Sequence, residues 1–274
     1  MKLKELLSKK LTKKQLKMLP TSFDVVGDIL IFNQFPEELE KKEKIIGDII
    51  LKEHKNVKII CKKTKKHSGI YRLPKLKIIA GQRRKETEHK ENNVRLKLNV
   101  EKVYFSARSS TERKRIYEQV KDGEDVLVMF SGCGPFTIEI ARNSNPKKVS
   151  AVEINPIAHE YAVENIKLNK VQDKVNLLFG DVNDILPKLK KKFDRILMPL
   201  PMWGEAFLEL AISKVKKKGI VHFYDFGEDT FQTAKIKVKE ACKQTKKKCK
   251  ILNAVKCGQF SPKVFRICID FRVE

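Results

Sequence analysis

The chain has 274 residues, 41% of them hydrophobic, which suffices for one large domain or two smaller ones with apolar cores. Lysine and arginine number 59 against 34 acidic residues, which gives a net charge of +25 and predicts a nucleic-acid partner. The alternative explanation is a lysine-rich surface of the kind that all proteins of some organisms share. No segment approaches the ~18–20 apolar residues of a membrane span or resembles a signal peptide, so we expect a cytoplasmic protein that does not bind membranes.

The first hundred residues predict a small α+β domain, residues 1–100. Leucines at helical spacing predict an amphipathic helix over residues 3–18 that ends at Pro20. The elements expected next are a strand pair or bent strand over 23–32, a charged helix over Glu37–Glu53, a strand over Val57–Cys61, a basic loop over 61–77, and a β-rich segment with a polar turn at Glu91–Asn93.

From residue 101 the pattern changes to alternating strands and helices. A helix is expected over Thr111–Lys121, where TERK follows two serines that could form a capping box. Strands are predicted at Val126–Phe130, Val149–Ile154, Val175–Phe179, Arg195–Met198, Ile220–Tyr224, Lys250–Val255 and Val264–Phe271. Five strand–helix units followed by two closing strands predict an α/β fold, a Rossmann-like doubly wound sheet over 101–274 whose last strands are antiparallel.

The most informative segment is the one that follows the first of these strands. A Gly-x-Gly turn at Gly132 and Gly134 leads into a helix near Phe136, whose first N–H groups can bind an anion. Glu153 ends the next strand, where a carboxylate can bind ribose hydroxyls. The turn reads G-x-G-P-F without a third glycine, which favours S-adenosylmethionine over a nicotinamide cofactor.

Two further strand ends carry candidate residues. Asp181 follows the third strand of the sheet, at the position for a side chain beside the adenine amino group; capping of the next helix is the alternative. Pro199 and Pro201 follow the fourth strand in MPLP and form a stiff loop suited to holding a planar base. The six cysteines contain no Cys-x-x-Cys pair, so we expect buried free thiols and no metal site.

Six segments, taken in order, carry a resemblance to a known family. They are GIYRLPKLKIIAG (69–81), VYFSARSSTERKRI (103–116), MFSGCGPF (129–136), VEINPIAHEYAVENIKLNK (152–170), DRILMPLP (194–201) and GIVHFYDF (219–226). Over residues 65–272 the chain resembles the archaeal and eukaryotic tRNA guanine-37 N1-methyltransferases. The resemblance implies a class I methyltransferase domain that uses S-adenosylmethionine and a small domain that helps to dock the tRNA anticodon loop. We expect the protein to be a monomer.

The same resemblance assigns roles to individual residues. Chemistry at guanine N1 needs a proton acceptor and a group that stabilises charge on O6. Glu112 in the STER motif stands at the position of the family's proton-accepting glutamate, and Arg72 in the GIYR motif at that of its arginine beside the target guanine. The cofactor residues implied by motif and resemblance are Tyr104, Arg108, Phe130, Gly132, Gly134, Pro135, Phe136, Glu153, Ile154, Asn155, Asp181, Val182 and Pro199. The substrate residues are Arg72, Arg113, Asn155, Pro199 and Pro201.

The sequence also departs from the family pattern. Val128 stands where the first strand usually has an acid, and Pro199 replaces the asparagine of an Asn-Leu-Pro motif. The residues before 65 are too few for a full copy of the extra N-terminal domain that many members carry. Two alternatives therefore stay open: the aminocarboxypropyl transferase of wybutosine synthesis, which shares fold and cofactor, and a non-catalytic RNA-binding protein on this scaffold. Retention of Glu112 and of the glycine turn favours methyl transfer.

Overall fold

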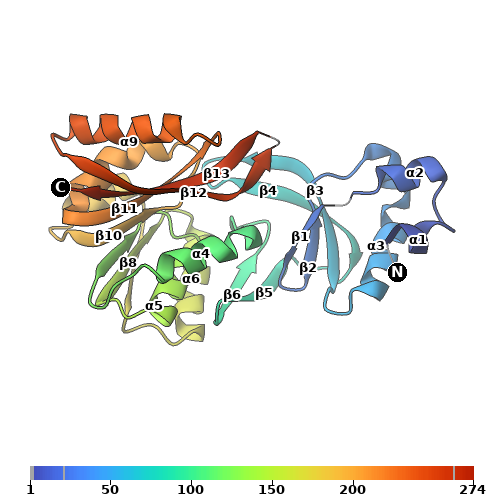
Figure 1. Ribbon diagram of the computed structural model, residues 1–274. Coiled ribbons are helices and arrows are strands. Elements are labelled where there is room, and N and C mark those ends of the chain that lie inside the picture. The colour runs from blue at the N-terminus through green and yellow to red at the C-terminus, as the bar shows by residue number, and fades with distance from the viewer. Residues whose placement is uncertain (1–2, 21, 262) are drawn as a thin grey trace. The chain divides into compact units, whose positions relative to one another are not determined.

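The computed structural model describes residues 3–20, 22–261 and 263–274, which form two compact units (Figure 1). The first unit comprises residues 1–90 and 96–107 apart from the undescribed positions, and the second comprises 91–95 and 108–274. The predicted boundary near residue 100 lies in the stretch where the chain passes from one unit to the other. Among the described residues, no helix combines the length and the apolar character needed to cross a membrane.

The first unit contains a four-stranded sheet in the order β1-β2-β3-β4, with β2 and β3 parallel and the other pairs antiparallel. Its strands are β1 Phe23–Val26, β2 Ile29–Phe32, β3 Ile59–Ser68 and β4 Leu73–Gly81. Its helices are α1 Leu3–Leu7, α2 Lys13–Met18, the 3-10 helix η1 Glu37–Lys42 and α3 Glu43–Glu53. Buried residues of α1, β2 and α3, such as Leu7, Phe32 and Ile46, share one apolar core.

Two expectations for this unit were wrong. The single helix over 3–18 is two short helices, because Thr12 and Gln15 form a reciprocal capping box that starts α2. The basic stretch 61–77 is the hairpin of β3 and β4 and not a loop. In β4 the exposed Lys75 and Lys77 alternate with buried residues such as Leu76, and alternation of this kind is the signature of a strand with one buried face.

The second unit is built on a seven-stranded sheet in the order β12-β13-β11-β10-β7-β8-β9. The strands from β11 to β9 are parallel, whereas β13 runs antiparallel to β11 and β12. The bounds are β7 Asp125–Val128, β8 Lys148–Glu153, β9 Val175–Phe179, β10 Phe193–Met198, β11 Val215–Gly227, β12 Cys249–Ser261 and β13 Val264–Val273. The predicted doubly wound sheet with antiparallel closing strands is confirmed.

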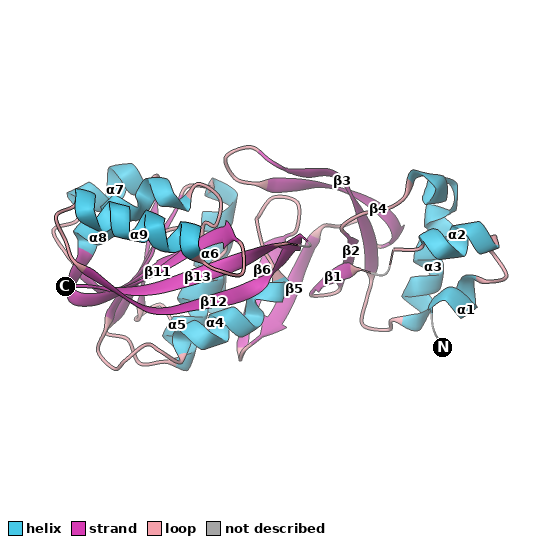
Figure 2. Ribbon diagram, turned by 45° about the horizontal axis from the view of Figure 1, so that its top comes forward, coloured by secondary structure: helices cyan, strands magenta, loops and turns pink. Residues whose placement is uncertain are grey.

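Helices cover both faces of this sheet. Figure 2 shows α7, α8 and α9 on one side and α4 and α5 on the other. The bounds are α4 Ser110–Tyr117, α5 Pro135–Asn143, α6 Pro156–Leu168, α7 Val182–Lys188, α8 Leu208–Lys214 and α9 Gln232–Gln244, with short 3-10 helices η2 Ala107–Ser109 and η3 Gly204–Phe207. The largest core cluster lies beneath α7, α8 and α9, where residues such as Leu186, Ile212 and Val238 pack on the central strands.

Two details of the segment where the chain passes between the units bear on the site. The strands β5 Glu86–Glu91 and β6 Val94–Asn99 form a hairpin that belongs mostly to the first unit, whereas residues 91–95 around its turn belong to the second. The turn contains Asn92 and Asn93, as the polar turn predicted. Helix α4 ends four residues before the predicted Lys121, and its N-cap Ser109 makes no side-chain capping bond. The capping box expected around Glu112 is therefore absent, and this glutamate is available for other contacts.

Candidate active site

The strand order places a switch point between β7 and β10, because the helices after these neighbouring strands lie on opposite faces of the sheet. Ligands of doubly wound sheets bind at such a point, beyond the carboxyl ends of the strands. Gly132 follows β7 here, Glu153 ends β8, Asp181 follows β9 and Pro199 follows β10. The structure thus brings the four predicted strand-end positions to one edge of the sheet.

The glycine turn has the backbone shape that only glycine adopts easily. Gly132 and Gly134 have φ values of 58° and 91°, and a Cβ atom on Gly134 would lie 2.9 Å from Cδ1 of Ile138. Gly134 caps helix α5 and Pro135 occupies its first turn. The turn therefore lets a ligand approach the backbone at the start of α5, where N–H groups have no partner within the helix.

Glu153 holds this turn in place. Its Oε2 accepts the Gly132 N–H at 2.6 Å and its Oε1 accepts the Asn155 N–H at 2.7 Å. Burial raises the pKa of Glu153, and the backbone N–H donors oppose that shift. Because a carboxylate has about four acceptor positions, Glu153 retains capacity for hydroxyl donors such as those of a ribose.

Three predicted cofactor residues also have structural roles, in helix capping or in core packing. Asp181 caps α7 by accepting the Asn183 N–H at 2.8 Å, which was the alternative reading of this residue. The buried side chain of Asn155 accepts N–H bonds from Ile157 and Ala158 and so caps α6. The side chain of Val182 packs in the core, and its predicted contact with the cofactor stays a prediction.

The remaining strand-end residues line this edge with apolar surface. Phe130 packs edge-on against Phe207, with ring centroids 5.0 Å apart, and Ile154 is exposed. In the proline loop, Pro199 is half-buried and Pro201 is buried, and their predicted contacts with the substrate stay predictions. Trp203 in the same loop has a φ of 67° and is 58% exposed.

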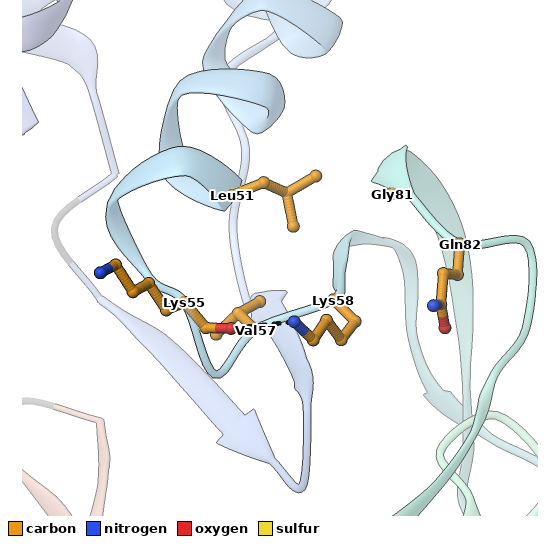
Figure 3. A pocket seen from close by; sticks show the side chains of 6 residues that line it. All are labelled: Leu51, Lys55, Val57, Lys58, Gly81 and Gln82. Atoms are coloured by element: carbon orange, nitrogen blue, oxygen red, sulfur yellow. Dashed lines mark hydrogen bonds between the residues drawn. The ribbon is translucent and has the colours of Figure 1, made fainter.

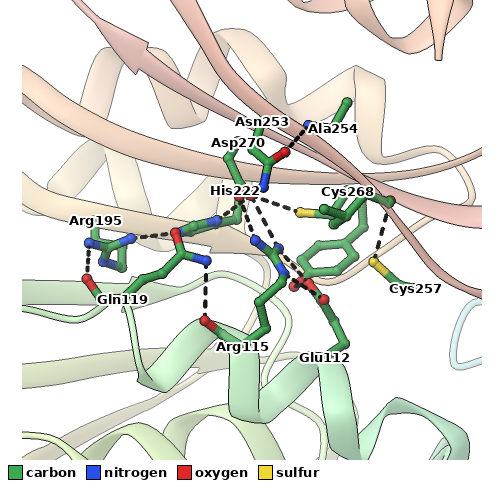
Figure 4. A network of polar contacts seen from close by, with 12 residues as sticks. Glu112, Arg115, Gln119, Arg195, His222, Asn253, Ala254, Cys257, Cys268 and Asp270 are labelled. Carbon is green, nitrogen blue, oxygen red and sulfur yellow. Dashed lines mark hydrogen bonds and ion pairs between the residues drawn. The ribbon is translucent and has the colours of Figure 1, made fainter.

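Glu112 lies beside the start of α5, although it comes from a different helix. Its side chain is only 6% exposed, and its Oε1 accepts the Tyr224 hydroxyl at 2.7 Å. The Tyr224 ring contacts the ring of Phe136, in the first turn of α5, at a centroid distance of 5.8 Å. Arg115 binds both oxygens of Glu112 through Nε and Nη2, each at 2.7 Å (Figure 4). A buried carboxylate is thus held in one orientation next to the glycine turn.

Arg113, the neighbour of Glu112 and a predicted substrate residue, is buried. Its guanidinium is 3% exposed and forms ion pairs with Glu91 at 2.6 Å and Glu139 at 2.9 Å. Arg113 thus ties α4 to α5 and to the tip of the β5–β6 hairpin, a role that side-chain burial determines and the STER motif alone does not indicate. Its predicted contact with the substrate stays a prediction.

The two carboxylates on Arg113 lead to a prediction about stability. Burial, the largest effect, raises the pKa of Glu139 to about 8, with Arg113 opposing the shift and Glu91 adding to it. A pKa above the ordinary 4.5 means that the folded protein holds the proton on Glu139 more tightly than the unfolded chain does. The contribution of this proton to the free energy of unfolding is therefore complete below pH 4.5 and is lost as the pH rises through about 8. Glu139→Gln removes this loss, so its stability relative to the parent should rise over that window by up to about 1.4 kcal/mol per pH unit.

Chemical denaturation at a series of pH values measures this difference, and it does not depend on any constant offset caused by the substitution. Glu118→Gln, at an exposed position on the same side of the sheet, is the matched control and should show no such trend. A difference between Glu139→Gln and the parent that stays constant from pH 5 to pH 8.5 would contradict the protonated state of Glu139.

The predicted residues Arg72 and Tyr104 belong to the first unit. Arg72 ends the β3–β4 turn with a φ of 54°, and its guanidinium carbon lies 5.5 Å from the centre of the Tyr104 ring. This cation–π contact orients the arginine side chain within its own unit. Arg108 begins the second unit and is exposed. The roles of all three residues in binding remain predictions.

A shallow hollow on the first unit is not a catalytic candidate (Figure 3). It is lined by Leu51, Lys55, Val57, Lys58, Gly81 and Gln82. The Lys58 ammonium donates to the backbone carbonyl of Lys55 at 3.1 Å, and the six lining residues include no carboxylate, imidazole or thiol that could serve as a base or nucleophile.

The structure adds residues that the sequence reasoning missed. His222 and Asp270 are buried at the centre of β11 and β13, and Asp270 accepts a hydrogen bond from Arg115 at 2.5 Å. With Cys268 they place three ligand-type atoms within 4.8 Å of one another, but Arg115 and Arg195 already bind two of them, and two guanidinium charges oppose a cation there. The signal available in the sequence was the polar, ionisable residue inside each apolar strand, IVHFYDF and ICIDF.

A glycine turn held by a strand-end glutamate, beside a buried carboxylate on a seven-stranded doubly wound sheet, defines a Rossmann-like methyltransferase. Comparison with known proteins gives the family: residues 87–252 match the TRM5/TYW2 methyltransferase domain and residues 3–84 match the TYW2 N-terminal domain. The chain belongs to the TRM5/TYW2 methyltransferase family.

Three similar proteins represent the branches of this family. The tRNA (guanine(37)-N(1))-methyltransferase Trm5b of Pyrococcus abyssi is 43% identical over 94% of this chain and 76% of its own length. Its crystal structure superposes with a TM-score of 0.87, at 40% identity over 97% of this chain and 78% of that one. The tRNA(Phe) (4-demethylwyosine(37)-C(7)) aminocarboxypropyltransferase of Pyrococcus horikoshii is 32% identical over 99% of this chain and 96% of its own length. A structure of P. horikoshii TYW2 in complex with MeSAdo has a TM-score of 0.82, at 29% identity over 99% of this chain and 97% of that one. A third structure, described as the complex of aTrm5 and tRNALeu, has a TM-score of 0.87 at 34% identity, covering all of this chain and 78% of that one.

Proposed function

We propose that this protein transfers the methyl group of S-adenosylmethionine to N1 of guanine 37 in the anticodon loop of tRNA. The observation that carries the proposal is the buried Glu112 carboxylate, held beside the start of α5 by Arg115 and Tyr224. The 43% identity to a tRNA (guanine(37)-N(1))-methyltransferase supports the same reaction. The net charge of +25 fits an RNA substrate.

The cofactor fits the residues at the strand ends. A ligand can approach Gly132 and Gly134 closely, and a side chain at Gly134 would collide with Ile138. Glu153 retains acceptor capacity for ribose hydroxyls, and the exposed side chain of Ile154 provides apolar surface at the end of the same strand. When bound, S-adenosylmethionine would supply an electrophilic methyl group, and the electron pair of the methyl carbon–sulfur bond would stay on the sulfur.

The protein must also remove the N1 proton of the guanine and stabilise the charge that develops on its O6. N1 carries a proton at neutral pH, and its lone pair becomes available only when that proton leaves. Glu112 accepts the proton, so that N1 can form its bond to the methyl carbon while the carbon–sulfur bond breaks. Negative charge that develops on O6 needs a cationic partner, and we assign this role to Arg72. A base in a single-stranded loop costs least to turn out of its stack.

One observation favours the aminocarboxypropyl transferase as a second candidate. Residues 3–84 match the TYW2 N-terminal domain, and this chain spans 96% of the P. horikoshii aminocarboxypropyltransferase against 76% of the P. abyssi methyltransferase. Both reactions consume S-adenosylmethionine but break different carbon–sulfur bonds. A label in the methyl group therefore separates them.

The deciding experiment incubates the purified protein with methyl-labelled S-adenosylmethionine and unmodified tRNA, followed by mass spectrometry of the nucleosides. Labelled 1-methylguanosine from position 37 is the expected result. Label that stays on the released methylthioadenosine, with a gain of the aminocarboxypropyl mass in a tRNA carrying a wyosine precursor, would assign the second reaction. Failure to modify either RNA, together with failure to bind the cofactor, would contradict both.

The charge excess gives a separate prediction for RNA binding. Each phosphate that the protein neutralises adds about 0.9 to the slope of log affinity against log salt for duplex RNA or DNA and about 0.7 for a single strand. With several contacts, raising salt from 0.05 to 0.2 M should weaken tRNA binding by at least about a hundredfold. Fluorescence anisotropy of labelled tRNA measures this, and cofactor binding in the same buffers is the control. A flat response would show that the lysines do not contact the RNA.

A further inference from the structure

The carboxylate of Glu112 shares its arginine with a second buried carboxylate. Arg115 binds Glu112 through Nε and Nη2, and Asp270 through Nη1 at 2.5 Å and Nη2 at 3.3 Å (Figure 4). One guanidinium charge is thus divided between two carboxylates that come from α4 and β13. The Asp270 and Glu112 side chains are 3% and 5% exposed and that of Arg115 is 23% exposed, so water screens the two carboxylates only weakly.

His222 holds Asp270 from the other side. Its Nδ1 lies 2.6 Å from Oδ1 of Asp270, and its Nε2 lies 2.7 Å from Nη1 of Arg195. Arginine has no acceptor, so Nε2 accepts and the ring proton is on Nδ1, which donates to Asp270. Burial, the largest effect, lowers the pKa of His222, and this agrees with a neutral ring. Arg195 is anchored in turn by Glu124.

The charge of Asp270 is therefore maintained. Burial alone would raise the pKa of Asp270, but hydrogen bonds from His222 and Arg115 outweigh burial and hold it below its ordinary value. Burial raises the pKa of the thiols of Cys257 and Cys268 and of the Tyr224 hydroxyl, so these neighbours of Glu112 stay neutral. Arg266 also carries charge near this cluster: it lowers the pKa of Cys257 and donates to the Ser109 hydroxyl at the start of α4. Arg115 is the cation that binds Glu112 directly, and Asp270 is the carboxylate that shares it.

We infer that Asp270, fixed by His222, is a positioning residue that sets the proton affinity of Glu112 by withdrawing part of the Arg115 charge from it. This inference rests on the proposed role of Glu112 as the base. A carboxylate paired with an undivided guanidinium would be strongly stabilised in its ionised form and would accept a proton poorly. Division of the guanidinium keeps Glu112 oriented by the bidentate contact and still able to take the N1 proton.

The test measures the single-turnover rate of methyl transfer to a tRNA transcript with guanosine 37 as a function of pH. Asp270→Asn leaves the whole Arg115 charge on Glu112, so the midpoint of the acidic limb should move down by about one pH unit and the plateau rate should fall several-fold. Arg115→Gln removes the cation, so its midpoint should move up. A purely structural role would lower both rates without moving the midpoints in opposite directions.

Controls separate this inference from the proposed function. Asp125→Asn removes a buried aspartate at the start of β7 that pairs with Lys191 and not with Arg115 or Glu112, and should keep the parental midpoint. If Asp270→Asn does not fold, the upward shift of Arg115→Gln tests the same charge effect. Midpoints equal to that of the parent in the folded variants, with Glu112→Gln inactive, would overturn the positioning role alone. Full activity of Glu112→Gln would overturn the base assignment on which the inference rests.

Discussion

Replacement of Glu112 by glutamine should lower the rate of methyl transfer by about a hundredfold or more and leave cofactor affinity nearly unchanged. General base catalysis contributes about 10²–10⁴ to a rate, and glutamine keeps the size of the side chain but cannot take the N1 proton. The glycine turn and Glu153 do not use Glu112, so the cofactor residues should keep their geometry. The drop should appear in kcat rather than in the binding step.

Single-turnover kinetics with saturating tRNA and cofactor measures this effect, and calorimetry with S-adenosylhomocysteine checks cofactor binding. Loss of the ion pair with Arg115 could also weaken the fold, so thermal unfolding accompanies both measurements. Glu118→Gln lies on the exposed surface just past α4 and serves as the matched control. A folded Glu112→Gln protein with the parental rate would remove Glu112 from the role of base.

Replacement of Glu153 by alanine is expected to weaken cofactor binding by at least about tenfold. The substitution leaves the N–H groups of Gly132 and Asn155 without their carboxylate acceptor, and the glycine turn loses its connection to β8. An unsatisfied buried donor costs about 1–3 kcal/mol, of which 1.4 kcal/mol corresponds to one factor of ten in affinity. Removal of the acceptor for ribose hydroxyls adds to this loss.

Calorimetry with S-adenosylhomocysteine measures the change for Glu153→Ala. Glu153→Gln keeps one carbonyl acceptor and should give an intermediate loss, while Glu160→Ala on the exposed side of α6 should bind like the parent. An unaltered dissociation constant in a folded Glu153→Ala protein would show that Glu153 neither shapes the turn nor binds the ribose.

The architecture of the second unit was largely accessible from the sequence. Strand β9 has the predicted bounds, Val175–Phe179, and the other strands of the sheet overlap their predictions. Central parallel strands are buried on both faces, so they appear as short apolar runs that a helix pattern then interrupts. The glycine turn could be located as well, because positive φ values at Gly132 and Gly134 demand a residue without a Cβ atom.

The first unit was harder to predict, for a reason visible in the 61–77 stretch. Exposed lysines on one face of the β3–β4 hairpin gave this stretch the composition of a basic loop. Lys62 is nonetheless buried and paired with Glu40 and Glu43 at 2.6 and 2.8 Å. Such pairing depends on which elements pack together, so composition alone cannot distinguish a buried lysine from a solvated one.

By itself, then, the sequence determined the doubly wound sheet, the glycine turn and the strand-end Glu153, because each depends on local spacing or on a backbone conformation. Glu112 was indicated by the resemblance of its STER motif to a known family, and local spacing did not single it out. Only the tertiary structure decided that Arg113 is buried between two carboxylates and that Glu112 shares Arg115 with Asp270, 155 residues further along the chain. Ion pairs of this kind form between residues that have no relation in sequence. Their strength comes from burial, which exists only once the sheet and its helices have packed.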